Sequence, residues 1–128
     1  MHTKTIRVLI VDDHDVVRRG LGVFLRAFED FELVGEASNG LEAISMCAEK
    51  QPNVVLMDIV MPEMDGITAT QHIHQRYPAI RVIALTSLKD DELVNKMLRA
   101  GAASFILKDT SIDCLADAIR SAGVQSQP

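Results

Sequence analysis

The sequence predicts an α/β protein built on a doubly wound, five-stranded parallel sheet with the strand order 2-1-3-4-5. Short apolar runs alternate five times with longer amphipathic stretches, and turn residues such as Asn39-Gly40 and Asp65-Gly66 separate them. Strands that alternate with helices of this length indicate a parallel sheet with helices on both faces. Right-handed crossovers leave few topologies for such a chain, and this order is the leading one.

The expected strands are short and rich in β-branched residues and leucine, as suits strands that are covered on both faces. The first runs from Ile6 to Val11, and the others span residues 31–38, 53–57, 81–85 and 103–107. The first, second, fourth and fifth helices are predicted from apolar stripes at helical spacing. These stripes are Val17, Leu21, Phe24, Leu25 and Phe28; Leu41, Ile44, Cys47 and Ala48; Leu93, Val94, Met97 and Leu98; and Ile112, Leu115, Ala116 and Ile119.

The remaining helix, the third, is expected to open at Asp65-Gly66 and to run to about Tyr77, where Pro78 stops it. Pro52 and Gly101 are read as the ends of the second and fourth helices. Proline cannot continue a helix, and glycine adopts the left-handed conformation that often ends one.

Length and composition favour one compact domain, which we expect to cover residues 1–122, with residues 123–128 starting a linker or tail. No window reaches the roughly 18–20 continuous apolar residues of a membrane span, and we expect no signal peptide. A net charge of −5 without a basic stripe argues against broad nucleic-acid binding by this segment. Cys47 and Cys114 are predicted to be reduced thiols in the core, which favours a cytoplasmic location over a secreted one.

Polar residues follow four of the predicted strands. Asp12 and Asp13 follow the first, Asp58 the third, Thr86 the fourth and Lys108 the fifth. The carboxyl ends of parallel strands lie along one edge, and ligands bind there at the switch point between the first and third strands. The prediction is therefore that three carboxylates, a hydroxyl and an ammonium group converge.

These residue types suit phosphoryl chemistry. Two carboxylates about 4 Å apart repel by roughly 4 kcal/mol at an effective dielectric constant near 20, so a cation must offset them. Mg²⁺ fits, because it prefers oxygen ligands, and one carboxylate could then act as a nucleophile and form an acyl phosphate. Lys108 and Thr86 could contact the transferring group. The alternative is that Asp12 and Asp13 merely cap the first helix and that Asp58 is a turn residue.

The chain resembles the receiver domain of response regulators over essentially its whole length. The matching segments are Val8-Leu9-Ile10-Val11-Asp12-Asp13-His14, Leu56-Met57-Asp58-Ile59-Val60-Met61-Pro62-Glu63-Met64-Asp65-Gly66, Leu85-Thr86, Gly101-Ala102 and Phe105-Ile106-Leu107-Lys108. The resemblance implies a flavodoxin-like receiver fold and phosphorylation of Asp58 by a sensor histidine kinase. It also implies Mg²⁺ bound by Asp12, Asp13, Asp58 and the backbone carbonyl of Val60, with Thr86 and Lys108 contacting the phosphoryl group.

A finer resemblance is to the NarL/FixJ group, through Val17-Arg18-Arg19-Gly20-Leu21 and Phe105-Ile106-Leu107-Lys108-Asp109. It implies a transcription regulator with a C-terminal helix-turn-helix DNA-binding domain absent from this chain. Thr86 and Phe105 would be the switch residues, and a homodimer through the fourth or fifth helix is expected on phosphorylation. Because Phe105 has no hydroxyl to hold an outward pose, it is expected to sit inward already.

Two departures from the family pattern matter. Asp109 stands where most receivers have proline after the lysine, so a cis peptide bond is not assumed there. Val60 stands two residues after Asp58, where aspartyl phosphatases need a second acid, which disfavours turnover of external phosphoesters. The chain is therefore expected to be no enzyme beyond its own phosphotransfer and dephosphorylation. The remaining alternative is a stand-alone receiver that acts as a phosphorelay or protein-binding switch. His14, His72 and His74 are assigned no chemistry.

Overall fold

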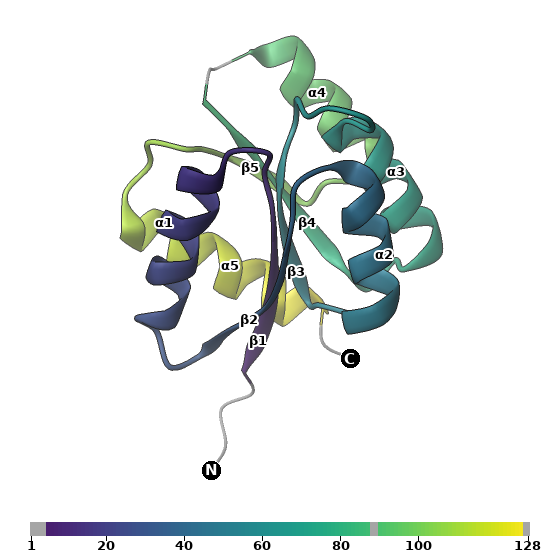
Figure 1. The fold of residues 1–128 in the computed structure, drawn as a ribbon. Coiled ribbons are helices and arrows are strands. Elements are labelled where there is room, and N and C mark those ends of the chain that lie inside the picture. The colour runs from purple at the N-terminus through teal and green to yellow at the C-terminus, as the bar shows by residue number, and fades with distance from the viewer. Residues whose placement is uncertain (1–4, 88–89, 127–128) are drawn as a thin grey trace.

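The computed structural model describes residues 5–87 and 90–126. Within them the strands form one parallel five-stranded sheet in the order β2-β1-β3-β4-β5, which confirms the predicted fold class. Helices α1 and α5 cover one face and α2, α3 and α4 the other (Figure 1). The elements in chain order are β1 (Ile6–Val11), α1 (Asp15–Arg26), β2 (Phe31–Ala37), α2 (Gly40–Lys50), β3 (Val54–Asp58), α3 (Gly66–Arg76), β4 (Arg81–Thr86), α4 (Asp91–Ala100), β5 (Ser104–Leu107) and α5 (Ile112–Ser126).

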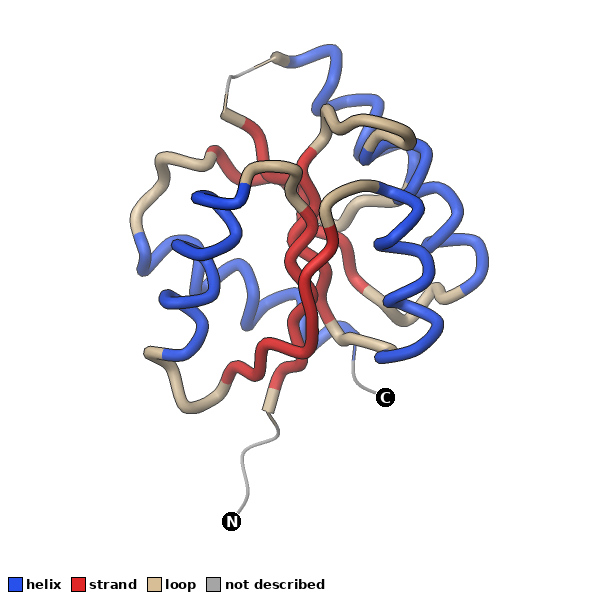
Figure 2. Tube along the Cα trace, viewed as in Figure 1, coloured by secondary structure: helices blue, strands red, loops and turns tan. Residues whose placement is uncertain are grey.

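Figure 2 shows the strands as a single layer between two layers of helices, and the core divides in the same way. Along β1, Val8 and Ile10 face the helices α1 and α5, whereas Leu9 and Val11 face α2, α3 and α4. All four side chains are fully buried, because successive residues of a strand point to opposite faces and both faces are covered. This explains why the strand sequence is continuously apolar instead of alternating.

Local sequence signals account for several helix ends. Asn39 and Asp65 accept hydrogen bonds from backbone N–H groups of the first turns of α2 and α3, as good N-caps do. Gly101 ends α4 with a φ of +119°, a conformation that suits glycine. Each predicted strand end agrees with the observed end to within one residue.

Three side chains lie differently from the prediction. Phe28 belongs to the predicted stripe of the first helix, yet α1 ends at Arg26, and Phe28 packs against Phe24 and Phe31 from the following loop. Ile112, placed on the core stripe of the last helix, is 61% exposed. Cys114 is exposed as well, whereas Cys47 is buried as predicted. Both errors on α5 lie in its first turn, before the helix reaches the sheet.

The last helix also extends beyond the predicted domain end at residue 122. It continues to Ser126 and buries Gly123, where a Cβ atom would lie 2.7 Å from the Ile6 side chain. Residues 123–126 of the expected linker are therefore helical, and 127 and 128 lie outside the described residues. Among the described residues no helix has both the length and the apolarity needed to cross a bilayer.

The two cysteines are expected to differ sharply in reactivity. Burial raises the pKa of the Cys47 thiol to about 12, so at neutral pH it is protonated as well as covered, whereas Cys114 is open to solvent. A thiol reagent should label the native protein once and the denatured protein twice, as measured by intact mass. Cys114→Ser should remove the native label. Labelling of Cys47 in the folded protein at a rate similar to Cys114 would contradict this expectation.

Candidate functional site

The candidate site lies at the carboxyl edge of the sheet, where the central strands β1 and β3 end side by side. Val11 pairs with Met57 in the strand register, so the next residues, Asp12 and Asp58, come out next to each other. Further along this edge, the backbone N–H of Lys108 donates to the carbonyl oxygen of Thr86 at 2.8 Å. The fold therefore brings the polar residues predicted from the sequence to one edge.

The side chains of this edge meet in a compact charged group. Lys108 Nζ lies 2.7 Å from Asp12 Oδ2 and 3.4 Å from Asp58 Oδ2. The contact with Asp12 is a close ion pair. Asp12 is fully buried and Asp58 is 7% exposed, whereas the Asp13 side chain is 28% exposed and lies nearer to solvent. Lys108 thus links the two buried carboxylates.

The loop after β3 holds Asp58 in place. The Ile59 N–H donates to Asp58 Oδ1 at 2.9 Å, and the Gly66 N–H closes the loop by donating to the Ile59 carbonyl at 2.7 Å. A Cβ atom on Gly66 would lie 2.1 Å from the Asp58 carbonyl oxygen, so no larger residue fits there without moving the backbone. Gly66 of the predicted turn Asp65-Gly66 therefore also holds the two ends of the Asp58 loop together.

Burial and charge shift the protonation of the central pair. Burial raises the pKa of Asp58, the charge of Asp12 raises it further, and the nearby Lys108 opposes both effects without cancelling them. Burial alone would lower the pKa of Lys108, but its contacts with Asp12 and Asp58 raise it overall. Lys108 is therefore charged at neutral pH. Ionisation of Asp58 destabilises the folded protein, because its pKa is raised on folding.

The raised pKa of Asp58 predicts how the stability of an Asp58→Asn variant depends on pH. A carboxyl whose pKa is raised on folding contributes stability below its ordinary value of 3.8 and loses it as the pH rises through the raised value. Without metal, Asp58→Asn should therefore be more stable than the parent at neutral pH. The difference should shrink as the pH falls through the raised pKa of Asp58. Denaturant melts across this range test it, and a stability difference that grows on acidification would refute it.

The donor set suits a hard divalent cation. Oxygen or nitrogen atoms of Asp12, Asp13, His14 and Asp58 all lie within 4.8 Å of one another. Asp13 Oδ1 is buried and has no hydrogen-bond partner among the described residues, which is costly for a carboxylate oxygen unless a cation binds it. The residues present therefore fit a metal ion, because they combine excess negative charge with an unsatisfied oxygen ligand.

Comparison with known proteins decides the family. Residues 8–120 match the family described as the response regulator receiver domain. The chain belongs to this family. It is a signalling domain of the two-component response regulators, as the motifs around Asp12, Asp58 and Lys108 predicted. Receiver domains typically bind Mg²⁺ at an acidic pocket, and this chain has a cluster of acidic residues with His14 at the sheet edge.

Two curated bacterial regulators are similar to this receiver domain over most of its length. It is 48% identical over 117 residues to the transcriptional regulatory protein LiaR of Bacillus subtilis. Over 116 residues it is 47% identical to the response regulator protein VraR of Staphylococcus aureus. Each alignment covers 91% of this chain and 56% of the relative, so the receiver domain spans little more than half of their length.

Solved structures agree with the family and the fold. The signal receiver domain of the response regulator NarL from Mycobacterium tuberculosis has a TM-score of 0.90 at 29% identity, covering 95% of this chain and 98% of that one. The response regulator domain of Thermotoga maritima CheB has a TM-score of 0.88 at 36% identity, covering 94% and 98%. This chain and the two solved receiver domains therefore share the whole doubly wound fold, and not only the residues of the site.

Two residues of the receiver site were not assigned chemistry from the sequence. His14 faces the carboxylates, with Nδ1 3.0 Å from Asp12 Oδ1. Arg18 donates to the carbonyl oxygen of Asp12, forms an ion pair with Asp15, and lies 3.4 Å from Glu36 Oε1. Their place next to the aspartate pair at the start of a helix is the only sequence signal that could have pointed to them.

The structure of the receiver domain settles two other expectations. Phe105, expected to sit inward, is 41% exposed, so its ring points outward in this state, and the inward expectation was wrong. The described residues contain no cis peptide bond, so Lys108–Asp109 is trans, as the absence of proline suggested. The Val60 side chain is 67% exposed on the loop after Asp58.

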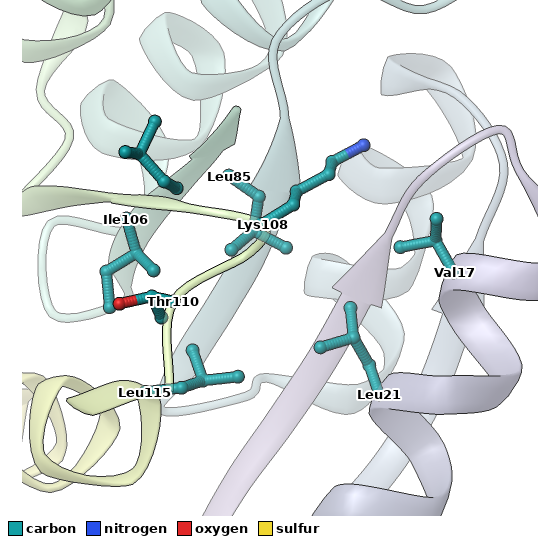
Figure 3. Close-up of a pocket in the computed structure, with 8 residues that line it drawn as sticks. Val17, Leu21, Leu85, Ile106, Lys108, Thr110 and Leu115 are labelled. Atoms are coloured by element: carbon teal, nitrogen blue, oxygen red, sulfur yellow. The ribbon is translucent and has the colours of Figure 1, made fainter. Parts of the chain in front are cut away.

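A small cavity of about 50 Å³ lies beside the receiver site, between α1 and the β5–α5 loop. Figure 3 shows Val17 and Leu21 of α1 on one side and Thr110 and Leu115 on the other. The Lys108 stem borders this cavity, and its amine extends away from Thr110 and Leu115 (Figure 3). The amine contacts Asp12 Oδ2. Lys108 therefore has free space next to its aliphatic stem, which leaves room for the side chain to change direction.

Proposed function

We propose that this receiver domain accepts a phosphoryl group on Asp58 from a sensor histidine kinase and thereby switches an output. The observation that carries the proposal is the position of Asp58, a nearly buried carboxylate within 3.4 Å of Lys108 and adjacent to two further aspartates. Such a group combines a nucleophile with a cation that can neutralise transferred charge.

The proposed metal ligands are Asp12, Asp13, Asp58 and the backbone carbonyl of Val60. Mg²⁺ is the proposed ion, since it accepts a few carboxylate ligands and otherwise keeps water. When bound, it supplies positive charge that offsets the carboxylates and the phosphate oxygens. The buried Oδ1 of Asp13, which accepts no hydrogen bond among the described residues and lies 3.2 Å from His14 Nδ1, supports this ligand set.

In the proposed transfer, an Asp58 carboxylate oxygen attacks the phosphorus of the donor. The bond from phosphorus to the donor breaks, and its electron pair leaves with the donor, so Asp58 becomes an acyl phosphate. Lys108 would turn from Asp12 to the new phosphate oxygens, and Thr86 would hydrogen-bond another of them. Water would later attack the phosphorus, the bond from phosphorus to the Asp58 oxygen would break, and inorganic phosphate would leave as the carboxylate is regenerated. The domain would thus act only on its own phosphoryl group.

The proposed output is transcription control by a C-terminal helix-turn-helix domain, since the aligned relatives are longer and one is named a transcriptional regulatory protein. We expect Thr86 and Phe105 to relay the change, and the domain to work in the cytoplasm, where histidine kinases phosphorylate their partners. Homodimerisation would use the face of α4, β5 and α5. Leu98 and Phe105 expose apolar surface there, which supports that choice.

The test is phosphorylation by a small donor. With Mg²⁺ and acetyl phosphate or phosphoramidate, intact-mass measurement should show one added phosphoryl group, and peptide mapping should place it on Asp58. Chelation of the metal should prevent the gain. A mass gain that maps elsewhere, or no gain with metal and donor in excess, would refute the proposal.

A further inference from the structure

The side chain of His14 points to a specific feature of the cation site. His14 is the N-cap residue of α1, but its ring makes no capping hydrogen bond. Instead Nδ1 lies 3.0 Å from Asp12 Oδ1 and 3.2 Å from Asp13 Oδ1. A helix start usually carries a residue whose side chain caps it, so this ring is turned from the common capping role to the carboxylates.

These separations match those of neighbouring ligands around one ion. With metal–ligand bonds of about 2.1 Å, adjacent corners of an octahedron lie about 3.0 Å apart. The nitrogen of His14 and the oxygens of Asp12 and Asp13 are already at that spacing, and an oxygen of Asp58 completes a set within 4.8 Å. The ring is 64% exposed, so it closes the set from the solvent side.

We infer that His14 is a ligand of the cation and sets its specificity, so that the site binds borderline transition cations such as Co²⁺ or Zn²⁺ more tightly than Mg²⁺. This inference rests on the cation site of the proposed function and names one more ligand for it. Imidazole nitrogen suits later first-row divalent ions, whereas Mg²⁺ prefers oxygen and gives up water reluctantly. A nitrogen ligand at this corner therefore favours later first-row divalent ions over Mg²⁺.

The rival interpretation is that the His14 ring only donates a hydrogen bond that orients the two carboxylates. The two roles make different predictions. Loss of an orienting hydrogen bond would weaken every cation alike, because the same oxygens hold each of them. Loss of a nitrogen ligand would weaken Co²⁺ and leave Mg²⁺ unaffected, because Mg²⁺ can take a water molecule at that corner.

The test titrates Co²⁺ and Mg²⁺ separately into the domain and into His14→Ser by calorimetry. Both are made in a Cys114→Ser background, since that exposed thiol is itself a cobalt ligand. Serine removes the ring and is a good N-cap, so this variant should be at least as stable in denaturant as its parent. His72→Ser, an exposed histidine on α3, is the matched control for surface binding.

The expected result is tighter binding of Co²⁺ than of Mg²⁺ by the parent. His14→Ser should lower the Co²⁺ affinity about tenfold or more and leave the Mg²⁺ affinity unchanged. Co²⁺ should also broaden the ring resonances of His14 in NMR spectra of the parent. His72→Ser should behave as the parent in both titrations.

Equal weakening of both cations by His14→Ser, or no weakening of Co²⁺, would overturn the inference. A parent domain that binds Mg²⁺ more tightly than Co²⁺ would overturn it too. If Co²⁺ binding depends on His14 while Mg²⁺ does not bind at all, the inference stands and the proposed magnesium role fails. Binding of neither cation would refute both.

Discussion

Asp58→Asn is expected to abolish covalent phosphorylation of the domain while the fold is kept. The amide cannot act as the carboxylate nucleophile, but it has nearly the same shape and can still accept the Ile59 N–H bond to Asp58 Oδ1. Incubation with Mg²⁺ and a small phosphodonor should leave the intact mass of the variant unchanged. The parent should gain one phosphoryl group under the same conditions.

The matched control is Asp65→Asn in the same loop. Asp65 caps α3 through the Thr68 N–H, and asparagine caps equally well, so this variant should fold and accept phosphate like the parent. Asp58→Asn phosphorylated to full yield would disprove the assignment of the acceptor. Loss of phosphorylation in both variants would instead indicate that the shape of the loop, and not Asp58 itself, was being tested.

Lys108→Met is expected to cause the largest loss of stability at the site. Removal of the ammonium group would leave the fully buried Asp12 without the ion pair that now offsets its charge. Breaking a buried pair on one side costs about 3 kcal/mol or more, because an uncompensated buried charge remains. Denaturant melts at neutral pH without divalent metal should show this loss, and added Mg²⁺ should reduce it.

The double variant Asp12→Asn, Lys108→Met separates charge from packing. It should recover most of the stability, because Asp12 then carries no buried charge and Asp58 is the one buried carboxylate of the pair that remains. Lys96→Met is the surface control: Lys96 pairs with Glu92 at 3.4 Å on the exposed side of α4, and its loss should cost about 0.5 kcal/mol or less. A Lys108→Met variant as stable as Lys96→Met would show that Asp12 carries no charge that needs Lys108.

The fold and the members of the site could be predicted because they depend on repeated, local patterns. Apolar strands such as β1 are covered on both faces, and the order of the strands then fixes which strand ends meet. Asp12 and Asp58 could thus be placed side by side without coordinates. The same logic placed Lys108 at the same edge.

What could not be predicted depends on which neighbour a side chain finds. The pairing of Lys108 with Asp12 in preference to Asp58 depends on distances of 2.7 and 3.4 Å, which no spacing in the sequence encodes. The outward ring of Phe105 and the exposure of Cys114 reflect where the β5 and α5 surfaces end. The His14 ring was set aside because a histidine at a helix start has several ordinary uses.

The contacts that join the two ends of the Asp58 loop determine the stage at which this loop becomes ordered. The Gly66 N–H bond to Ile59 and the close approach of Gly66 to the Asp58 carbonyl tie the two ends of the loop together. The chain entropy of this segment is therefore lost when the sheet forms, not when a phosphodonor arrives. In the proposed transfer, a donor molecule would meet an acceptor that is already ordered, and its binding energy would not be needed to organise the backbone around Asp58.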